Sequence, residues 1–119
     1  MNGDGRVLVV DDFPDIAYSV CALLSLHGWQ CRAALDGGSA LDIAAGFSPD
    51  VLLTELELPD MTGYDLAREL RVRAGGRRIR LAALTRHSGV SASASYRAGF
   101  HRHMLKPASR QMLLDAIAT

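Results

Sequence analysis

The sequence has few cysteines, no long apolar run and almost no lysine. Its two cysteines, Cys21 and Cys31, are too few for a disulfide framework or a cysteine-based zinc site, which favours a reduced chain in the cytoplasm. Apolar runs such as Val7–Val10 and Val51–Leu53 are short and interrupted, so we expect no membrane-spanning helix. The first six residues lack the basic and apolar regions of a secretory signal.

Length and charge set further limits. With 119 residues, 49% of them hydrophobic and 22% charged, the chain is expected to form one domain around a single core. Its net charge is zero, but residues 1–69 hold 12 acidic and 3 basic residues, whereas residues 70–119 hold 1 acidic and 10 basic residues. This balance argues against a uniformly basic nucleic-acid binder, so direct nucleic-acid binding is not expected.

Strand-like and helix-like segments alternate five times along the chain. The hydrophobic pattern predicts strands at 6–11, 29–34, 51–54, 79–84 and 101–105. It predicts helices from 14 to about 27 and at 39–46, 64–73, 90–98 and 109–118. Strands that alternate with helices in this way indicate an α/β fold, with a parallel sheet covered by helices on both faces.

Polar residues with distinct chemistry stand at the ends of four of the predicted strands. They are Asp11 and Asp12, then Glu55 and Glu57, then Thr85, and finally Lys106. The carboxyl ends of parallel strands share one edge, where ligands bind, so these groups are expected to converge. Clustered carboxylates repel one another, and Mg²⁺ would relieve that repulsion. The only lysine, beside 12 arginines, suits a site that needs a point charge for a phosphate. The alternative is that the two aspartates cap a helix and Lys106 lies on the surface.

Four motifs together resemble the receiver domain of two-component response regulators. They are Val7–Asp12, Pro49–Gly63, Leu84–Thr85 and Leu105–Pro107. The resemblance covers the whole chain, residues 1–119, and implies a flavodoxin-like (βα)5 domain with strand order 2-1-3-4-5. It also implies that Asp12 binds Mg²⁺ directly, that Asp11 binds it through water, and that the backbone carbonyl of Glu57 is a further ligand. Thr85 and Lys106 would bind the phosphoryl group.

The family's phosphoacceptor is an aspartate four residues before the proline of the following loop, and here that position holds Glu55. Its carboxylate extends about 1.5 Å further than that of aspartate. A displacement of ~1 Å costs on the order of 10²-fold in such a step, so we expect Glu55 to accept phosphate poorly or not at all. Three outcomes stay open: Glu55 imitates an aspartyl phosphate, the site is a silent interaction module, or phosphorylation is merely slow.

Two further positions depart from the family pattern. Arg86 follows Thr85, where the family has a small residue, and a solvent-exposed orientation is favoured over one that binds phosphate or obstructs a donor. His103 stands at the aromatic switch position, where it would pack inward or outward and titrate near neutrality. A zinc site formed by His87, His101 and His103 is disfavoured, because no fourth ligand is apparent.

The resemblance implies a signalling module and not an enzyme. Its partner would be a sensor histidine kinase, a phosphotransfer protein or a downstream effector. The last helices and strands would form the contact surface, with Arg102, Met104 and Met112 as its expected residues. A small Mg²⁺-dependent phosphatase or phosphotransfer enzyme is one rival, although the short loops leave little room for a substrate pocket. A scaffold without metal is the other, and a Mg²⁺ titration would separate it from the family site.

Overall fold

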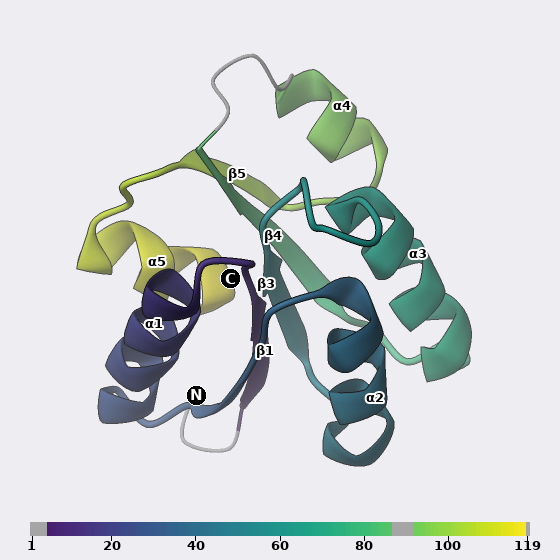
Figure 1. The fold of residues 1–119 in the computed structure, drawn as a ribbon, viewed down its shortest axis with the longest axis horizontal. Helices are drawn as coiled ribbons and strands as arrows, with labels where there is room; N and C mark the ends of the chain where they lie inside the picture. Colours follow the sequence, from purple (N-terminus) through teal and green to yellow (C-terminus); the bar gives the residue numbers. More distant parts are fainter. Residues whose placement is uncertain (1–4, 87–91, 119) are drawn as a thin grey trace.

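The computed structural model describes residues 5–86 and 92–118, and within them five strands alternate with five helices (Figure 1). The strands are β1 (Arg6–Val10), β2 (Gln30–Ala34), β3 (Val51–Thr54), β4 (Arg80–Thr85) and β5 (Arg102–Leu105). The helices are α1 (Pro14–Leu26), α2 (Gly37–Phe47), α3 (Gly63–Ala74), α4 (Ala92–Arg97) and α5 (Arg110–Ala118). All strand pairs are parallel, in the order β2-β1-β3-β4-β5, which confirms the predicted topology.

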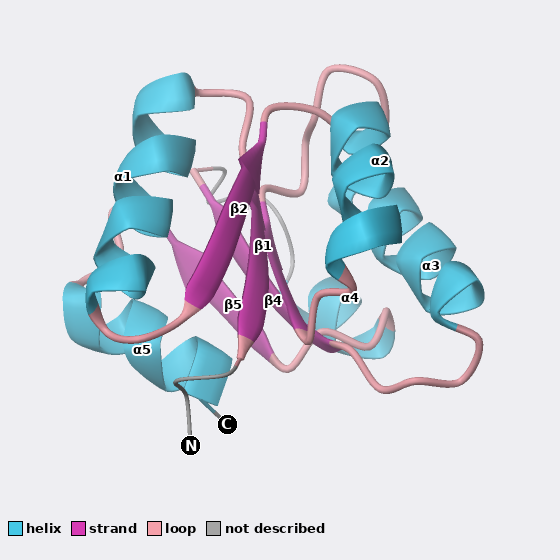
Figure 2. Cartoon of the chain, turned by 90° about the horizontal axis from the view of Figure 1, so that it is seen from below, coloured by secondary structure: helices cyan, strands magenta, loops and turns pink. Residues whose placement is uncertain are grey.

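Helices cover both faces of the sheet. Helices α1 and α5 lie on one face, and α2, α3 and α4 lie on the other (Figures 1 and 2). Within the described part of the chain, no helix combines the length and apolarity that crossing a bilayer demands.

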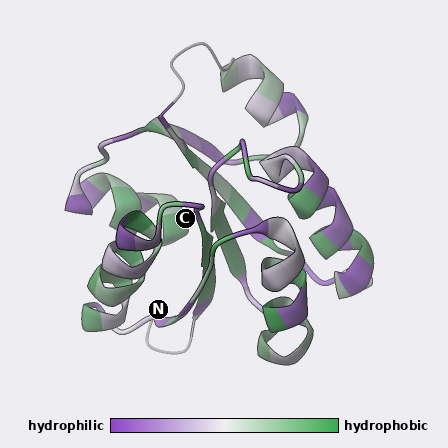
Figure 3. Ribbon diagram, in the orientation of Figure 1, coloured by the Kyte–Doolittle hydropathy of each residue, from purple (hydrophilic) through white to green (hydrophobic). Residues whose placement is uncertain are grey.

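Strand β1 supplies both hydrophobic layers, which explains its uninterrupted apolar sequence. Val7 and Val9 belong to the layer under α1 and α5, whereas Leu8 and Val10 belong to the layer under α2 and α3. Successive strand residues point to opposite faces, so a strand buried on both faces must be apolar at every position. Figure 3 shows hydrophobic residues along these central strands and hydrophilic residues at the strand ends.

Side-chain caps fix the starts of α2 and α3. Helix α3 begins with a capping box, in which the Thr62 hydroxyl accepts from the Asp65 amide at 3.1 Å and the Asp65 carboxylate accepts from the Thr62 amide. Helix α2 begins at Gly37, two residues before the predicted start. The Asp36 side chain caps it, and the Asp60 carboxylate accepts from the Gly37 and Gly38 amides at 2.9 Å. These side chains accept hydrogen bonds from amides at the helix starts, which have no partner within the helix itself.

The predicted helix at 90–98 is only partly tested. Helix α4 spans Ala92–Arg97, and the predicted positions Val90 and Ser91 lie outside the described residues. The last predicted helix is present as α5, in which the Ser109 hydroxyl accepts from the Met112 amide at 3.1 Å.

Candidate functional site

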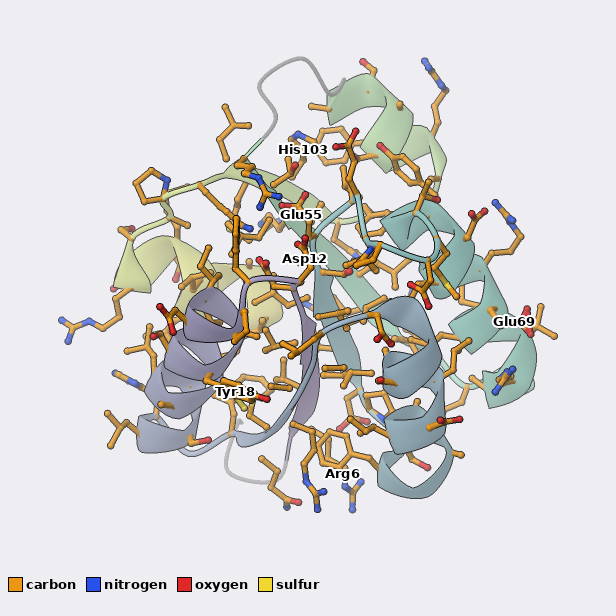
Figure 4. The ribbon with its side chains drawn as sticks, viewed as in Figure 1. Arg6, Asp12, Tyr18, Glu55, Glu69 and His103 are labelled. Atoms are coloured by element: carbon orange, nitrogen blue, oxygen red, sulfur yellow. The ribbon has the colours of Figure 1, made fainter. Side chains whose placement is uncertain are left out.

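The strand ends bring the predicted polar groups to one edge of the sheet. The sheet hydrogen bonds continue one residue beyond β1, β3 and β5: the amide of Asp11 donates to the Ala34 carbonyl, that of Glu55 to the Val10 carbonyl and that of Lys106 to the Thr85 carbonyl. Asp11, Glu55 and Thr85 are buried, with at most 2% of their surface exposed. In Figure 4, Asp12 and Glu55 lie together at this edge, and Arg6 lies at the opposite end of the molecule. The predicted convergence of Asp11, Asp12, Glu55, Thr85 and Lys106 is therefore present in the structure.

Lys106 bridges two of the carboxylates. Its Nζ donates to Glu55 Oε1 at 3.0 Å and forms an ion pair with Asp11 Oδ2. Only 10% of the Lys106 side chain is exposed. A buried ammonium needs such partners, because an unpaired charge loses its hydration without compensation. The lysine therefore lies inside the site and not on the surface.

The Glu55 carboxylate has hydrogen-bond partners on both oxygens. Oε1 accepts from Lys106, and Oε2 accepts from the backbone amide of Leu56 at 2.8 Å. Burial alone would raise the pKa of Glu55, but hydrogen bonds from Thr85, Lys106 and Leu56 outweigh burial and hold the pKa below its ordinary value. Glu55 is consequently ionised at neutral pH and bound by a hydroxyl, an ammonium and an amide.

Arg86 is exposed, as expected from the sequence, but its guanidinium also faces the carboxylates, which was not expected. Its Nη1 lies 3.7 Å from Glu55 Oε1, and its Nη2 lies 3.9 Å from Asp12 Oδ2. The guanidinium carbon lies 4.3 Å from the centre of the Phe13 ring. Stacking on an aromatic face and charge attraction both favour this orientation, although 36% of the Arg86 side chain remains exposed.

The carboxylates, as arranged, do not fit a divalent cation. Among residues 5–86 and 92–118, no three histidine, cysteine, aspartate or glutamate side chains are grouped so that they could hold a metal ion. Asp11 is engaged by Lys106 and by the Phe13 amide, and Glu55 is engaged by Lys106 and Leu56. One donor remains: Asp12 Oδ1 is buried and has no hydrogen-bond partner in the described chain. The predicted magnesium site thus has carboxylate donors, but the protein's own cations occupy most of them.

Two further predicted residues, Glu57 and His103, make the contacts that follow. Glu57 is exposed, and its backbone pairs with Thr62 in an isolated bridge. His103, on β5, is half-buried, and its Nδ1 lies 2.7 Å from the Ser95 hydroxyl of α4. Ser95 in turn lies 3.1 Å from the Tyr64 hydroxyl of α3. Ser95 and Tyr64 were not predicted from the sequence, although a serine in a helix of small residues is a weak sign of close packing.

The histidine zinc site gains no support. His87 lies outside the described residues, so its part is not tested. The other two histidines have separate partners: His101 Nδ1 accepts from the Leu81 amide at 3.1 Å, and His103 contacts Ser95.

The prediction that Met104 belongs to the contact surface is wrong. Met104 is 6% exposed and packs in the core under α1 and α5. Arg102 and Met112 are exposed, as expected.

This chain is similar to known proteins over most of its length. Residues 7–118 match the response regulator receiver domain family. The chain is 30% identical over 113 residues to PilH of Pseudomonas aeruginosa, an alignment that covers 94% of this chain and 93% of PilH. It is 34% identical over 110 residues to the response regulator MprA of Mycobacterium avium, but it spans only 47% of that protein's length.

Solved structures agree with the fold. The chemotaxis response regulator CheY4 of Vibrio cholerae superposes with a TM-score of 0.84 at 26% identity, over 96% of each chain. A CheY-like receiver domain protein from Methanospirillum hungatei gives the same TM-score and identity, over 96% of this chain and 90% of that chain. The chain therefore belongs to the response regulator receiver domain family of two-component signalling proteins.

Proposed function

We propose that this receiver domain signals through protein–protein contact from a state that resembles the phosphorylated one, with Glu55 in place of the phosphoacceptor. The observation that carries this proposal is the capture of the Glu55 carboxylate by both Lys106 and Thr85. In the family resemblance, these two residues bind the phosphoryl group. Glutamate therefore presents a negative charge to the groups that would detect phosphate, although with about one charge against up to ~2 for a phosphoryl group.

The same contacts make Glu55 a poor phosphoacceptor. In-line attack on a phosphodonor needs a carboxylate oxygen free to approach phosphorus, and catalysis of that step is mostly positioning and charge neutralisation. Both Glu55 oxygens accept hydrogen bonds, and Arg86 lies 3.7 Å from Oε1. This arrangement favours the imitation of phosphate over the two alternatives, a silent module and a slowly phosphorylated receiver. No turnover of phosphate esters is expected either.

The partners and the contact surface follow from the family. We expect a sensor histidine kinase or phosphotransfer protein, or a downstream effector, to contact the surface formed by α4, β5 and α5. His103 lies on that surface at the switch position, where the Ser95 hydroxyl holds its ring beneath α4. A half-buried ring at this position is consistent with one fixed state of the surface.

The proposed function does not require magnesium. The family resemblance assigns Mg²⁺ to Asp11, Asp12, Glu55 and the Glu57 carbonyl, but the carboxylates already bind Lys106 and Arg86. No step of the proposed mechanism uses the metal.

An intact-mass measurement tests the proposal. The protein is incubated with a small acyl phosphate and Mg²⁺, and a receiver of the same family with an aspartate acceptor serves as the positive control. We expect the control to gain phosphate and this chain to keep its mass. A stoichiometric phosphate adduct on Glu55 would overturn the proposal, and so would hydrolysis of a phosphate ester by the purified domain.

A further inference from the structure

Arg86 spans the gap between two carboxylates that come from different strands. Asp12 follows β1 and Glu55 follows β3, and the Arg86 guanidinium lies 3.9 Å from the first and 3.7 Å from the second. The Phe13 ring supports the guanidinium from one side, at 4.3 Å. Three independent contacts therefore hold one flexible side chain over the acidic cluster.

The charges of the cluster show what the guanidinium replaces. Three carboxylates, those of Asp11, Asp12 and Glu55, face two cations, Lys106 and Arg86, in the described chain. One net negative charge remains, and the orphaned Asp12 Oδ1 is the oxygen without a partner. If Arg86 were absent, two negative charges would remain, which is the charge that one divalent cation neutralises.

A divalent cation and the guanidinium therefore cannot share this position without strong repulsion. A metal ion at Asp12 and Glu55 would lie within a few ångströms of Arg86, and like charges at such distances repel each other even near the protein surface. The guanidinium would also have to give up its contact with Phe13.

We infer that Arg86 is a built-in cation that takes the place of the divalent metal, so that the site is held together without Mg²⁺ and binds it only when the guanidinium leaves. This inference rests on the proposed function, because it explains how Glu55 keeps its contacts with Lys106 and Thr85 in the absence of metal.

A metal titration of the whole chain tests the inference. Mg²⁺ is added at constant ionic strength, and backbone amide shifts of Asp11 and Asp12 are followed by NMR for the wild type and for Arg86→Ala. We expect Arg86→Ala to bind Mg²⁺ at least about tenfold more tightly, because the competing charge is gone. The matched control is Arg73→Ala, which removes an exposed arginine that pairs with Glu69 at 3.3 Å, and its Mg²⁺ affinity is expected to equal that of the wild type.

Two further measurements keep the test independent of one variant. Phe13→Ala removes the ring beneath the guanidinium and is expected to tighten Mg²⁺ binding by a smaller factor than Arg86→Ala. In the wild type, saturating Mg²⁺ is expected to shift the Arg86 Nε resonance as the guanidinium is displaced. Equal Mg²⁺ affinity in the wild type and Arg86→Ala, or an Arg86 Nε signal that saturating Mg²⁺ leaves unmoved, would refute the inference.

Phosphate uptake separates this inference from the proposed function. Glu55→Asp alone is expected to gain little phosphate from an acyl phosphate and Mg²⁺, whereas Glu55→Asp combined with Arg86→Ala is expected to gain much more. If Glu55→Asp alone is fully phosphorylated, Arg86 does not exclude the metal, but the proposed role of Glu55 stands. If the wild type is phosphorylated, the proposed function fails, whatever the metal affinity of Arg86→Ala.

Discussion

At the scale of single residues, Lys106 is the residue on which the acidic cluster depends most. It pairs with Asp11 and Glu55, and both carboxylates are almost fully buried. Lys106→Met would leave two like charges without their common partner, so we expect a loss of about 3 kcal/mol in the free energy of unfolding, measured by urea denaturation. In the Lys106→Met background, Glu55→Gln is expected to recover part of that loss. If Lys106→Met is as stable as the wild type, the ion pairs do not hold the cluster together.

The residues that form the acidic cluster could be predicted from the sequence, but the contacts that they make were less predictable. Asp11, Glu55, Thr85 and Lys106 were predictable because the ends of parallel strands meet at one edge. The orientation of Arg86 was not, since a long side chain has many rotamers and its choice depends on Phe13, which the sequence alone does not place beside it. Met104 was misplaced for a related reason: a four-residue strand shows too short a pattern to indicate which face the helix α5 covers.

At the scale of elements, Ser95 joins α3, α4 and β5. Its buried hydroxyl contacts both the Tyr64 hydroxyl and His103 Nδ1. Ser95→Ala would leave these two groups without their partner, and we expect a loss of about 1 to 2 kcal/mol in stability together with a shift of the His103 ring signals. Ser93→Ala, an exposed position on the same helix, is the matched control. Equal effects of the two substitutions would show that the hydroxyl contacts contribute nothing.

The start of α2 should respond to acid. Hydrogen bonds from the Gly37 and Gly38 amides hold the pKa of Asp60 below its ordinary value of 3.8. Because the pKa is lower in the folded state, this contribution to stability is complete above that ordinary value and is lost as the pH falls through the folded pKa. We expect the two glycine amide shifts to titrate below pH 3.8 in NMR spectra. Asp60→Asn should abolish that titration, and a midpoint at or above the ordinary value would contradict the assignment.

At the scale of the whole molecule, the site and the α4–β5–α5 surface are joined through β5. Lys106 follows that strand directly and binds Glu55, while His103 lies three residues earlier, beneath α4. Glu55→Gln removes the charge that holds Lys106, so we expect amide shifts to extend from the site to Ser95 and His103 but not to α2. Glu69→Gln, an exposed acid on α3, is the control and should change only its neighbours. Shifts confined to the site would contradict the coupling.

Strand β1 contributes to both hydrophobic layers, and this limits the insertions and deletions that the chain tolerates. Its last four residues, Val7–Val10, alternate between the two hydrophobic layers, and Asp11 then follows in the acidic cluster. Inserting or deleting one residue there would turn every later side chain to the wrong face and shift the first carboxylate off the edge. Substitutions that preserve volume should therefore be accepted along β1, whereas a change of a single residue in its length should abolish folding and signalling together.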